Sequence, residues 1–302
     1  MFALLNESGH ILDQSFRVPD FVVSGRTEFS IEATTVNPTQ GGGAGAAPPT
    51  PSHREDGLEY YQEYLPIRYA GPLVAKLRKE YWRLPQVEGR PHVLAIQDFH
   101  APMSMTWTRS ALPTYLYGYR HRPIREHDGS LEVMPERVEV HRWGSKEVPS
   151  GFFALEGAEN VSAVLFNSSA TLSKFNRIGQ QAGFGSPDVL QVQQGFRVDH
   201  DPNASEPIRF VRQVDEGFSE SWAEGMDLFH NPRALHPLDR DTFPDAAHHR
   251  LEPDGTLTSR CPPWHPLASV TTIVVAAKGA LGRTEAEWAP NIENGVVHRD
   301  DH

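Results

Sequence analysis

Residues 17–36 constrain the fold of this chain more than any other segment, because they predict a two-stranded hairpin whose register can be counted. A Ser-Gly-Arg turn signal at positions 24–26 separates two groups of strand-forming residues, which are Val22, Val23, Phe29 and Ile31. If the chain turns about Arg26, Asp20 faces Glu32 across the ladder, with the two Cβ atoms about 5 Å apart. The hairpin therefore predicts two neighbouring carboxylates.

Two carboxylates at this distance repel one another unless a positive charge lies between them, and a divalent cation is the usual solution. Thr34 is two residues beyond Glu32 and so shares its face of the strand. The alternate residues of this strand are predicted to face a core: Phe29, Ile31 and Ala33. The plainer interpretation is a solvated hairpin in which both carboxylates face water.

A helix carrying lysines is predicted downstream, near Pro72, which suits a first helical turn. Apolar residues recur there at helical spacing in one stripe: Leu73, Leu77, Tyr81 and Leu84. At about 100° per residue, Lys76 lies beside this stripe and Lys79 nearly opposite it. Residues 91–98 then form a short apolar run that is typical of a buried strand. The order hairpin, helix, strand indicates a mixed sheet with a helix packed on it.

These residues resemble the PD-(D/E)XK nuclease superfamily over residues 1–100. Pro19-Asp20 and Glu32-Ala-Thr fall on adjacent strands, and the lysine-bearing helix and the buried strand follow. The resemblance implies an α/β fold with a mixed central sheet and flanking helices, like the core of restriction endonucleases. It also implies that Asp20 and Glu32 bind Mg²⁺ or Mn²⁺, and that the protein is a metal-dependent phosphodiester hydrolase acting on DNA.

In this superfamily a lysine usually stands two residues after the glutamate, where this chain has Thr34. The resemblance therefore implies that Lys76, or alternatively Lys79, supplies the cation from the helix. The first helix of the family carries a glutamate, and Glu7 is the candidate for it here. Thr34 and Arg109 are predicted to contact the substrate.

The charge of the chain limits its partners. The 39 acidic and 28 basic side chains give a formal net charge of −11, which suits nucleic-acid binding only if basic residues gather locally. Residues 109–125 offer such a group, because arginines alternate with tyrosines that could stack on bases; the alternative is a half-exposed segment whose tyrosines pack on the domain. Cys261 is the only cysteine, so no intramolecular disulfide is possible and a reducing cytoplasm is expected. No apolar run is long enough for a membrane span.

The chain is predicted to contain a nuclease-like core in residues 1–120, interrupted by a flexible Gly- and Pro-rich insertion at 39–56. A second, β-rich region is expected at 121–290, followed by a polar, disordered tail at 291–302.

Two strands and one helix stand out in the second region. Residues 159–166 and 268–275 are apolar runs that predict buried strands. A short helix is expected within residues 167–182, and its apolar side is formed by Leu172, Phe175 and Ile178.

Histidines are dense in the same region, and with Asp227, Asp239 or Asp245 they could form a zinc or iron site. Their spacing matches no established ligand signature, and prolines follow two of them, which favours histidines that bridge loops. The histidines are His230, His236, His248, His249 and His265.

Two other functions remain open. Asp98-x-His100 ends the strand predicted at 91–98 and resembles the first metal-binding motif of metallophosphoesterases, although the two companion motifs do not occur. A catalytically inactive, nuclease-fold binding protein is the other alternative. Geometry discriminates this binding protein from the nuclease, because hydrolysis requires Lys76 or Lys79 to reach the face that carries Asp20 and Glu32.

Overall fold

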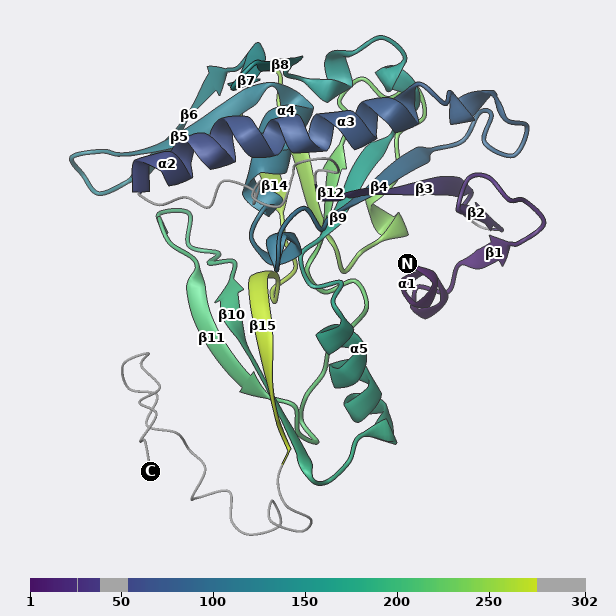
Figure 1. Ribbon diagram of the computed structural model, residues 1–302, viewed down its shortest axis with the longest axis vertical. Helices are drawn as coiled ribbons and strands as arrows, with labels where there is room; N and C mark the ends of the chain where they lie inside the picture. The colour runs from purple at the N-terminus through teal and green to yellow at the C-terminus, as the bar shows by residue number, and fades with distance from the viewer. Residues whose placement is uncertain (26, 39–53, 276–302) are drawn as a thin grey trace.

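A mixed sheet of eight strands forms the centre of the molecule, and helices lie on both of its faces (Figure 1). The computed structural model describes residues 1–25, 27–38 and 54–275. The predicted α/β class with a mixed central sheet is confirmed. The tail predicted at 291–302 lies outside the described residues, as does the insertion predicted at 39–56 except for positions 54–56.

The strands of the central sheet run in the order β1-β2-β3-β4-β9-β12-β13-β14. β3, β4 and β9 are parallel neighbours and β12 is parallel to β13, whereas the other neighbours are antiparallel. The division predicted at residue 120 runs through this sheet, because β1 to β4 precede that residue and the other strands follow it. The strands are β1 (Ile11–Asp13), β2 (Phe21–Ser24), β3 (Phe29–Val36), β4 (His92–Asp98), β9 (Ala163–Asn167), β12 (Met226–His230), β13 (Ala247–Leu251) and β14 (Leu257–Arg260).

Smaller sheets and short helices surround the central sheet. The smaller sheets are β11-β10-β15, β5-β6 and β7-β8, formed by β5 (Tyr119–Arg125), β6 (Leu131–Arg137), β7 (Val140–Trp143), β8 (Lys146–Pro149), β10 (Val189–Arg197), β11 (Ile208–Gln213) and β15 (Pro266–Val275). The helices are α1 (Phe2–Glu7), α2 (Arg54–Glu59), η1 (Tyr60–Tyr64), α3 (Leu65–Leu77), η2 (Tyr81–Arg83), η3 (Ser104–Thr106), η4 (Arg109–Ala111), α4 (Leu112–Tyr117), η5 (Phe152–Ala154), η6 (Ala158–Asn160), α5 (Leu172–Gly179), η7 (Gln180–Phe184) and η8 (Arg240–Thr242).

The predicted hairpin is present, and its register is the predicted one. β2 and β3 pair Phe21 with Ile31, so the next position along the ladder places Asp20 opposite Glu32. The strand predicted at 91–98 is β4, which lies beside β3 in parallel.

A continuous helical segment made of α2, η1 and α3 lies between β3 and β4 in the sequence. It crosses the molecule over the central sheet (Figure 1). α3 begins before the start predicted at Pro72 and ends at Leu77. The predicted stripe does not continue past that residue, because Glu80 adopts a left-handed backbone with a φ of 51° and a separate turn, η2, follows it. Lys79 consequently lies outside the helix that carries Lys76.

Two apolar cores lie on opposite faces of the central sheet. α3 and α4 pack over one face, where Leu73 and Leu94 are fully buried. Phe29 and Ile31 are buried in the other core, as predicted, together with residues of α1. Ala33 was expected in this core but is exposed, because the β2–β3 ladder ends two positions before it. Within the described ranges, no helix is long and apolar enough to cross a bilayer.

β11, β10 and β15 form an antiparallel sheet that projects from the central sheet together with α5, and we call this unit the arm (Figure 1). β15 includes the strand predicted at 268–275, and β9 includes the second half of the strand predicted at 159–166. β9 is buried as expected, whereas β15 leaves Val270 and Ile273 exposed, because it belongs to the arm and not to the central sheet.

α5 is the helix predicted within residues 167–182, but it packs with the opposite side inward. Leu172 is 84% exposed and Phe175 58% exposed, whereas Lys174 and Arg177 are buried. The side that carries Leu172 and Phe175 is therefore not the side that α5 buries. The physical reason is that buried carboxylate and carbonyl groups receive the two cationic side chains, as described below.

Candidate functional site

The end of the hairpin holds Asp20 and Glu32 next to one another through main-chain hydrogen bonds. The Asp20 amide donates to Glu32 Oε2 over 3.1 Å, and the Ala33 amide donates to Asp20 Oδ2 over 2.7 Å. Each carboxylate thus accepts an amide of the opposite strand at the point where the ladder stops. Asp20 is exposed to solvent, whereas Glu32 is buried.

Two further donors reach Glu32 from the segment that follows the hairpin. Lys76, in the last turn of α3, places Nζ 2.5 Å from Glu32 Oε1, and the Tyr81 hydroxyl donates to the same oxygen over 2.7 Å. The Lys76 side chain is 25% exposed, so its ammonium lies between a buried carboxylate and the surface. Lys76 therefore meets the geometric condition that hydrolysis requires.

Sequence reasoning assigned Tyr81 to an apolar stripe and missed its contact with Glu32. Burial, together with the hydrogen bond to Glu32, raises the pKa of Tyr81 above its ordinary value, so the phenol remains a neutral donor. A signal was available in its chemistry, because a buried tyrosine hydroxyl normally requires a hydrogen-bond acceptor.

Lys79 does not share the position of Lys76. It is exposed beyond the end of α3, and its amide donates to the Lys76 carbonyl over 3.0 Å. No ion pair joins the Lys79 side chain to either carboxylate in the part of the chain that the structure describes. Lys79 is thus a surface cation next to the site.

Glu7 and Thr34, the other predicted site residues, differ from Lys76 in their positions relative to the carboxylates. Glu7 Oε2 accepts the Trp222 amide over 2.7 Å, which ties the end of α1 to the loop before β12. Between the described residues, no hydrogen bond or ion pair links Glu7 to Asp20 or Glu32. Thr34 is half-buried on β3, and it borders a cavity whose floor is formed by the alternate residues Ala33 and Thr35 on the far side of the sheet from α3.

The two carboxylates offer hard oxygen ligands of the kind that Mg²⁺ prefers. No group of three or more His, Cys, Asp or Glu side chains is arranged to hold a metal ion within residues 1–25, 27–38 and 54–275. Mg²⁺ nevertheless needs only one or two carboxylates, because it keeps several of its waters. Asp20 Oδ1 has no hydrogen-bond partner among the described residues, so this pair fits a water-rich magnesium ion.

Arg109 lies in a buried ion pair and not in an open basic groove. Its Nε and Nη2 atoms each lie 2.5 Å from an oxygen of Asp227. The Arg109 side chain is 20% exposed, and its pair with Asp227 gives it a structural role, while the substrate contact predicted for it stays a prediction. Tyr115 and Tyr117 are buried, which agrees with the alternative that the tyrosines of this segment pack on the domain.

His249 and His265 complete the network around Asp227. Their Nε2 atoms lie 2.9 Å and 3.2 Å from Asp227 Oδ1. Burial alone would raise the pKa of Asp227, but the Arg109 guanidinium and the two imidazoles hold that pKa well below its ordinary range. Since Arg109 supplies the positive charge, the network is balanced without a metal ion.

His230 and His248 form a second buried contact between β12 and β13. His230 Nε2 and His248 Nδ1 are 2.8 Å apart, and His248 Nε2 is 2.9 Å from the Phe243 carbonyl. Burial, with His248 as the next cause, lowers the pKa of His230 to about 3, so it is neutral at neutral pH. These histidines join neighbouring strands of the central sheet, and His248 also bridges to the loop before β13, as expected for histidines of this region.

Asp98 and His100 form a hydrogen-bonded chain with Tyr60. His100 Nδ1 lies 2.7 Å from Asp98 Oδ1, and His100 Nε2 lies 2.6 Å from the Tyr60 hydroxyl. Both ring nitrogens of His100 are therefore occupied, which leaves none for a metal. This geometry does not favour the metallophosphoesterase alternative.

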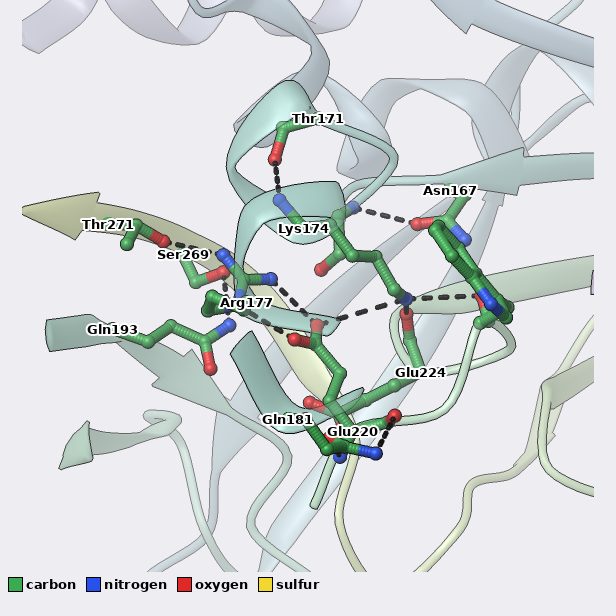
Figure 2. Close-up of polar contacts among 12 residues, drawn as sticks. Asn167, Thr171, Lys174, Arg177, Gln181, Gln193, Glu220, Glu224, Ser269 and Thr271 are labelled. Carbon is green, nitrogen blue, oxygen red and sulfur yellow. Dashed lines mark hydrogen bonds and ion pairs between the residues drawn. The ribbon is translucent and has the colours of Figure 1, made fainter. Parts of the chain in front are cut away.

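A buried ion cluster holds α5 of the arm against the loop that precedes β12, and sequence reasoning missed it (Figure 2). Arg177 donates to both oxygens of Glu220 over 2.7 Å, while Lys174 Nζ donates to the carbonyl groups of Glu224 and Trp222 over 2.7 Å and 3.1 Å. Burial lowers the pKa of Lys174 to about 8. The available signal was the spacing of the two cations, which places them on one side of α5.

Comparison of the chain with family models, with curated proteins and with solved structures gave no match. The arrangement of Asp20, Glu32 and Lys76 is therefore interpreted from its own geometry and chemistry.

Proposed function

We propose that the protein is a magnesium-dependent phosphodiester hydrolase of the PD-(D/E)XK type, with DNA as its substrate. The observation that carries this proposal is the contact of Lys76 with Glu32, directly opposite Asp20 on the hairpin. The order of elements also supports it, since α1 precedes the antiparallel strands β1 to β3, and α3 then leads to β4 in parallel with β3.

Asp20 and Glu32 would hold Mg²⁺ or Mn²⁺, which supplies Lewis-acid activation of water and neutralises charge on the phosphate. The Ala33 amide fixes the Asp20 carboxylate, and Tyr81 together with the Asp20 amide fixes Glu32. Lys76 then presents a half-exposed ammonium beside these carboxylates. An ammonium at this position stabilises negative charge that develops on an attacked phosphodiester and orients the attacking water.

Local positive charge can offset the net charge of −11 at this site. Exposed basic side chains precede Asp20 and follow Lys76 along the chain, and they are Arg17, Arg78 and Lys79. Contacts of such side chains with backbone phosphates would be independent of sequence and would weaken as the salt concentration rises.

A second candidate function is nucleic-acid binding without cleavage, and one observation favours it. Lys76, Tyr81 and the Asp20 amide already satisfy both oxygens of Glu32, so this carboxylate is balanced without a metal. In this alternative, the contact of Lys76 with Glu32 serves to fix the hairpin to α3.

Plasmid cleavage in Mg²⁺ or Mn²⁺ distinguishes the two candidates. We expect nicking by the wild-type protein, no nicking by Glu32→Gln, and a loss of about 100-fold or more in Lys76→Met, because an electrostatic stabiliser of the transition state is removed. Lys79→Met is the matched control, since it removes the same charge three residues away and is expected to cleave within a few-fold of wild type.

Absence of cleavage by the folded wild-type protein, with no Mn²⁺ binding by calorimetry, would reject the hydrolase and leave the binding protein. Equal losses in the two lysine variants would reject the specific role of Lys76.

A further inference from the structure

A cavity of about 460 Å³ lies at the carboxyl ends of the parallel strands β3, β4 and β9. Alternate residues of these strands share the face that forms its floor, which consists of Ala33, Thr35, Ala95, Gln97, Leu165 and Asn167. Open α/β sheets commonly bind ligands at this edge, and small-molecule sites typically have volumes of roughly 300–1,000 Å³. The position and the size of the cavity therefore suit a small molecule or one unit of a polymer.

Aromatic side chains from three segments form the walls, and they are exposed to an unusual degree for their size. Phe2 of α1 is 55% exposed, Phe99 after β4 is 44% exposed, and Phe175 of α5 is similarly exposed. The Phe175 ring lies 4.7 Å from the ring of Trp222, which also lines the cavity. These rings offer flat apolar surfaces on which a planar ligand can stack.

Two amide side chains supply polar groups on the floor. Gln97 Nε2 donates to the Asn167 carbonyl over 3.0 Å, and Asn167 Oδ1 accepts the Ser169 amide over 2.8 Å. Gln97 Oε1 and Asn167 Nδ2 have no hydrogen-bond partner within the described part of the chain. One acceptor and one donor thus remain for a ligand, and Figure 2 shows Asn167 beside Lys174 of α5.

The wall that contains Phe175 is held in place by the buried ion cluster. Lys174 fixes the Trp222 carbonyl, and Glu7 fixes the Trp222 amide from α1. The wall is therefore organised before any ligand binds, which lowers the entropy cost of binding.

The cavity also adjoins the carboxylate site. Ala33 lines the cavity, and its amide holds the Asp20 carboxylate. Thr34, the next lining residue, lies two positions after Glu32 on β3. Glu32 and Lys76 lie on the opposite, α3-facing side of β3, so the contact of Ala33 with Asp20 is the link between the cavity and the carboxylate site.

We propose that this cavity binds a nucleobase, namely a base of a nucleic-acid strand that passes the edge of β3 at Asp20. That the base belongs to the substrate strand rests on the proposed function; the base site itself stands on the aromatic walls and the amide groups. Any base can stack on an aromatic ring, whereas amide side chains recognise base edges by hydrogen bonding. A base inside a duplex cannot enter such a cavity, so the substrate is single-stranded or has an extruded base.

Direct binding of deoxynucleoside 5′-monophosphates tests the site without any need for cleavage. The four mononucleotides are titrated by calorimetry in buffer containing EDTA, with deoxyribose 5-phosphate as the probe that lacks a base. We expect saturable binding of the nucleotides and weaker binding of the sugar phosphate. Phe175→Ala is expected to weaken nucleotide binding about tenfold, because one stacking surface is lost.

Leu172→Ala is the matched control, since Leu172 is an exposed apolar residue of the same helix that does not line the cavity. It is expected to leave nucleotide binding unchanged. Gln97→Leu, which keeps the side-chain size, is expected to reduce the differences in affinity among the four bases.

The base site is overturned if the nucleotides bind no more tightly than deoxyribose 5-phosphate, or if Phe175→Ala binds them as well as Leu172→Ala does. It is also overturned if indole, which stacks but lacks the edge of a base, competes as strongly as the nucleotides. Nucleotide binding by a protein that does not cut plasmid would retain the base site and reject the hydrolase. Metal-dependent cleavage without nucleotide binding would reject the base site and retain the hydrolase.

Discussion

The two apolar cores of the central sheet and the arm bury opposite kinds of side chain. The central sheet encloses apolar residues on both faces, such as Leu94 on one and Phe29 on the other. The arm instead buries Lys174, Arg177 and Glu220 and exposes much of its apolar surface to solvent. Hydrophobic periodicity therefore located buried surfaces correctly in the central sheet and misplaced them in the arm.

This difference has an energetic meaning. An apolar core gains stability from the area that it removes from water, with little dependence on exact partners. A buried ion cluster gains little over an apolar replacement, yet it is strongly destabilised when one member is removed, because the remaining charge is left without compensation. The interior of the arm should therefore depend on charge complementarity, as the Arg109–Asp227 pair of the central sheet does and the two apolar cores do not.

The largest effect is expected from Glu220→Gln. This substitution keeps the size of the side chain but leaves Arg177 and Lys174 without their buried counter-charge. We expect a loss of about 3–5 kcal/mol in the free energy of unfolding, measured by urea denaturation. Glu216→Gln, an exposed change in the same loop, is the control. A loss below about 1 kcal/mol would remove the contrast between the two regions.

The pH dependence of the arm should follow Lys174. Its pKa is about 8 in the folded protein and 10.5 as the ordinary value, so the unfolded chain binds more protons between these pH values. Stability should therefore rise as the pH increases from about 8 to 10.5, by up to about 3 kcal/mol at roughly 1.4 kcal/mol per pKa unit. The measurement is the difference in unfolding free energy between wild type and Lys174→Met across this range. A difference that stays constant with pH would contradict the expectation.

A smaller effect is expected from Tyr81→Phe in the central sheet, where Glu32 is a buried charge. Loss of the hydrogen bond to Glu32 Oε1 should cost about 1–2 kcal/mol of unfolding free energy, because Lys76 and the Asp20 amide remain as partners. Thermal denaturation of the variant would measure this loss. No change would show that the hydroxyl contributes nothing to the orientation of Glu32.

The smallest effects are expected on the exposed apolar surface of the arm. Leu172→Ala and Val270→Thr should each change the unfolding free energy by no more than about 0.5 kcal/mol, because neither side chain is buried. Urea denaturation and sedimentation together test this expectation. A larger loss, or a change in sedimentation, would show that another surface covers these residues.

Local pairing rules explain what the sequence predicted correctly. The hairpin register followed from a two-residue period and a turn signal, and it placed Asp20 opposite Glu32. The strand at 91–98 was recognisable as a short apolar run beside a helix. Lys76 was predicted to flank the helical stripe, and this position brings its ammonium to Glu32.

The features that the sequence did not predict depend mainly on partners that are distant in the sequence. The ion pair of Arg109 with Asp227 joins residues 118 positions apart, and no local pattern contains that information. The same is true of Arg177 with Glu220, which reverses the buried side of α5. The end of α3 was missed for a different reason, namely the left-handed backbone of Glu80, which is uncommon for that residue type.

The alternation along β3 and β4 separates two kinds of evolutionary change. Residues such as Ala33 and Ala95 line the cavity, while their neighbours Glu32 and Leu94 face α3. Substitutions at the small lining residues can therefore reshape the space for a ligand while the packing beneath α3 stays as it is. The ligand specificity of the cavity can therefore diverge at these positions faster than the fold or the carboxylate pair. β3 and β4 keep their packing against α3 while their cavity-lining residues change.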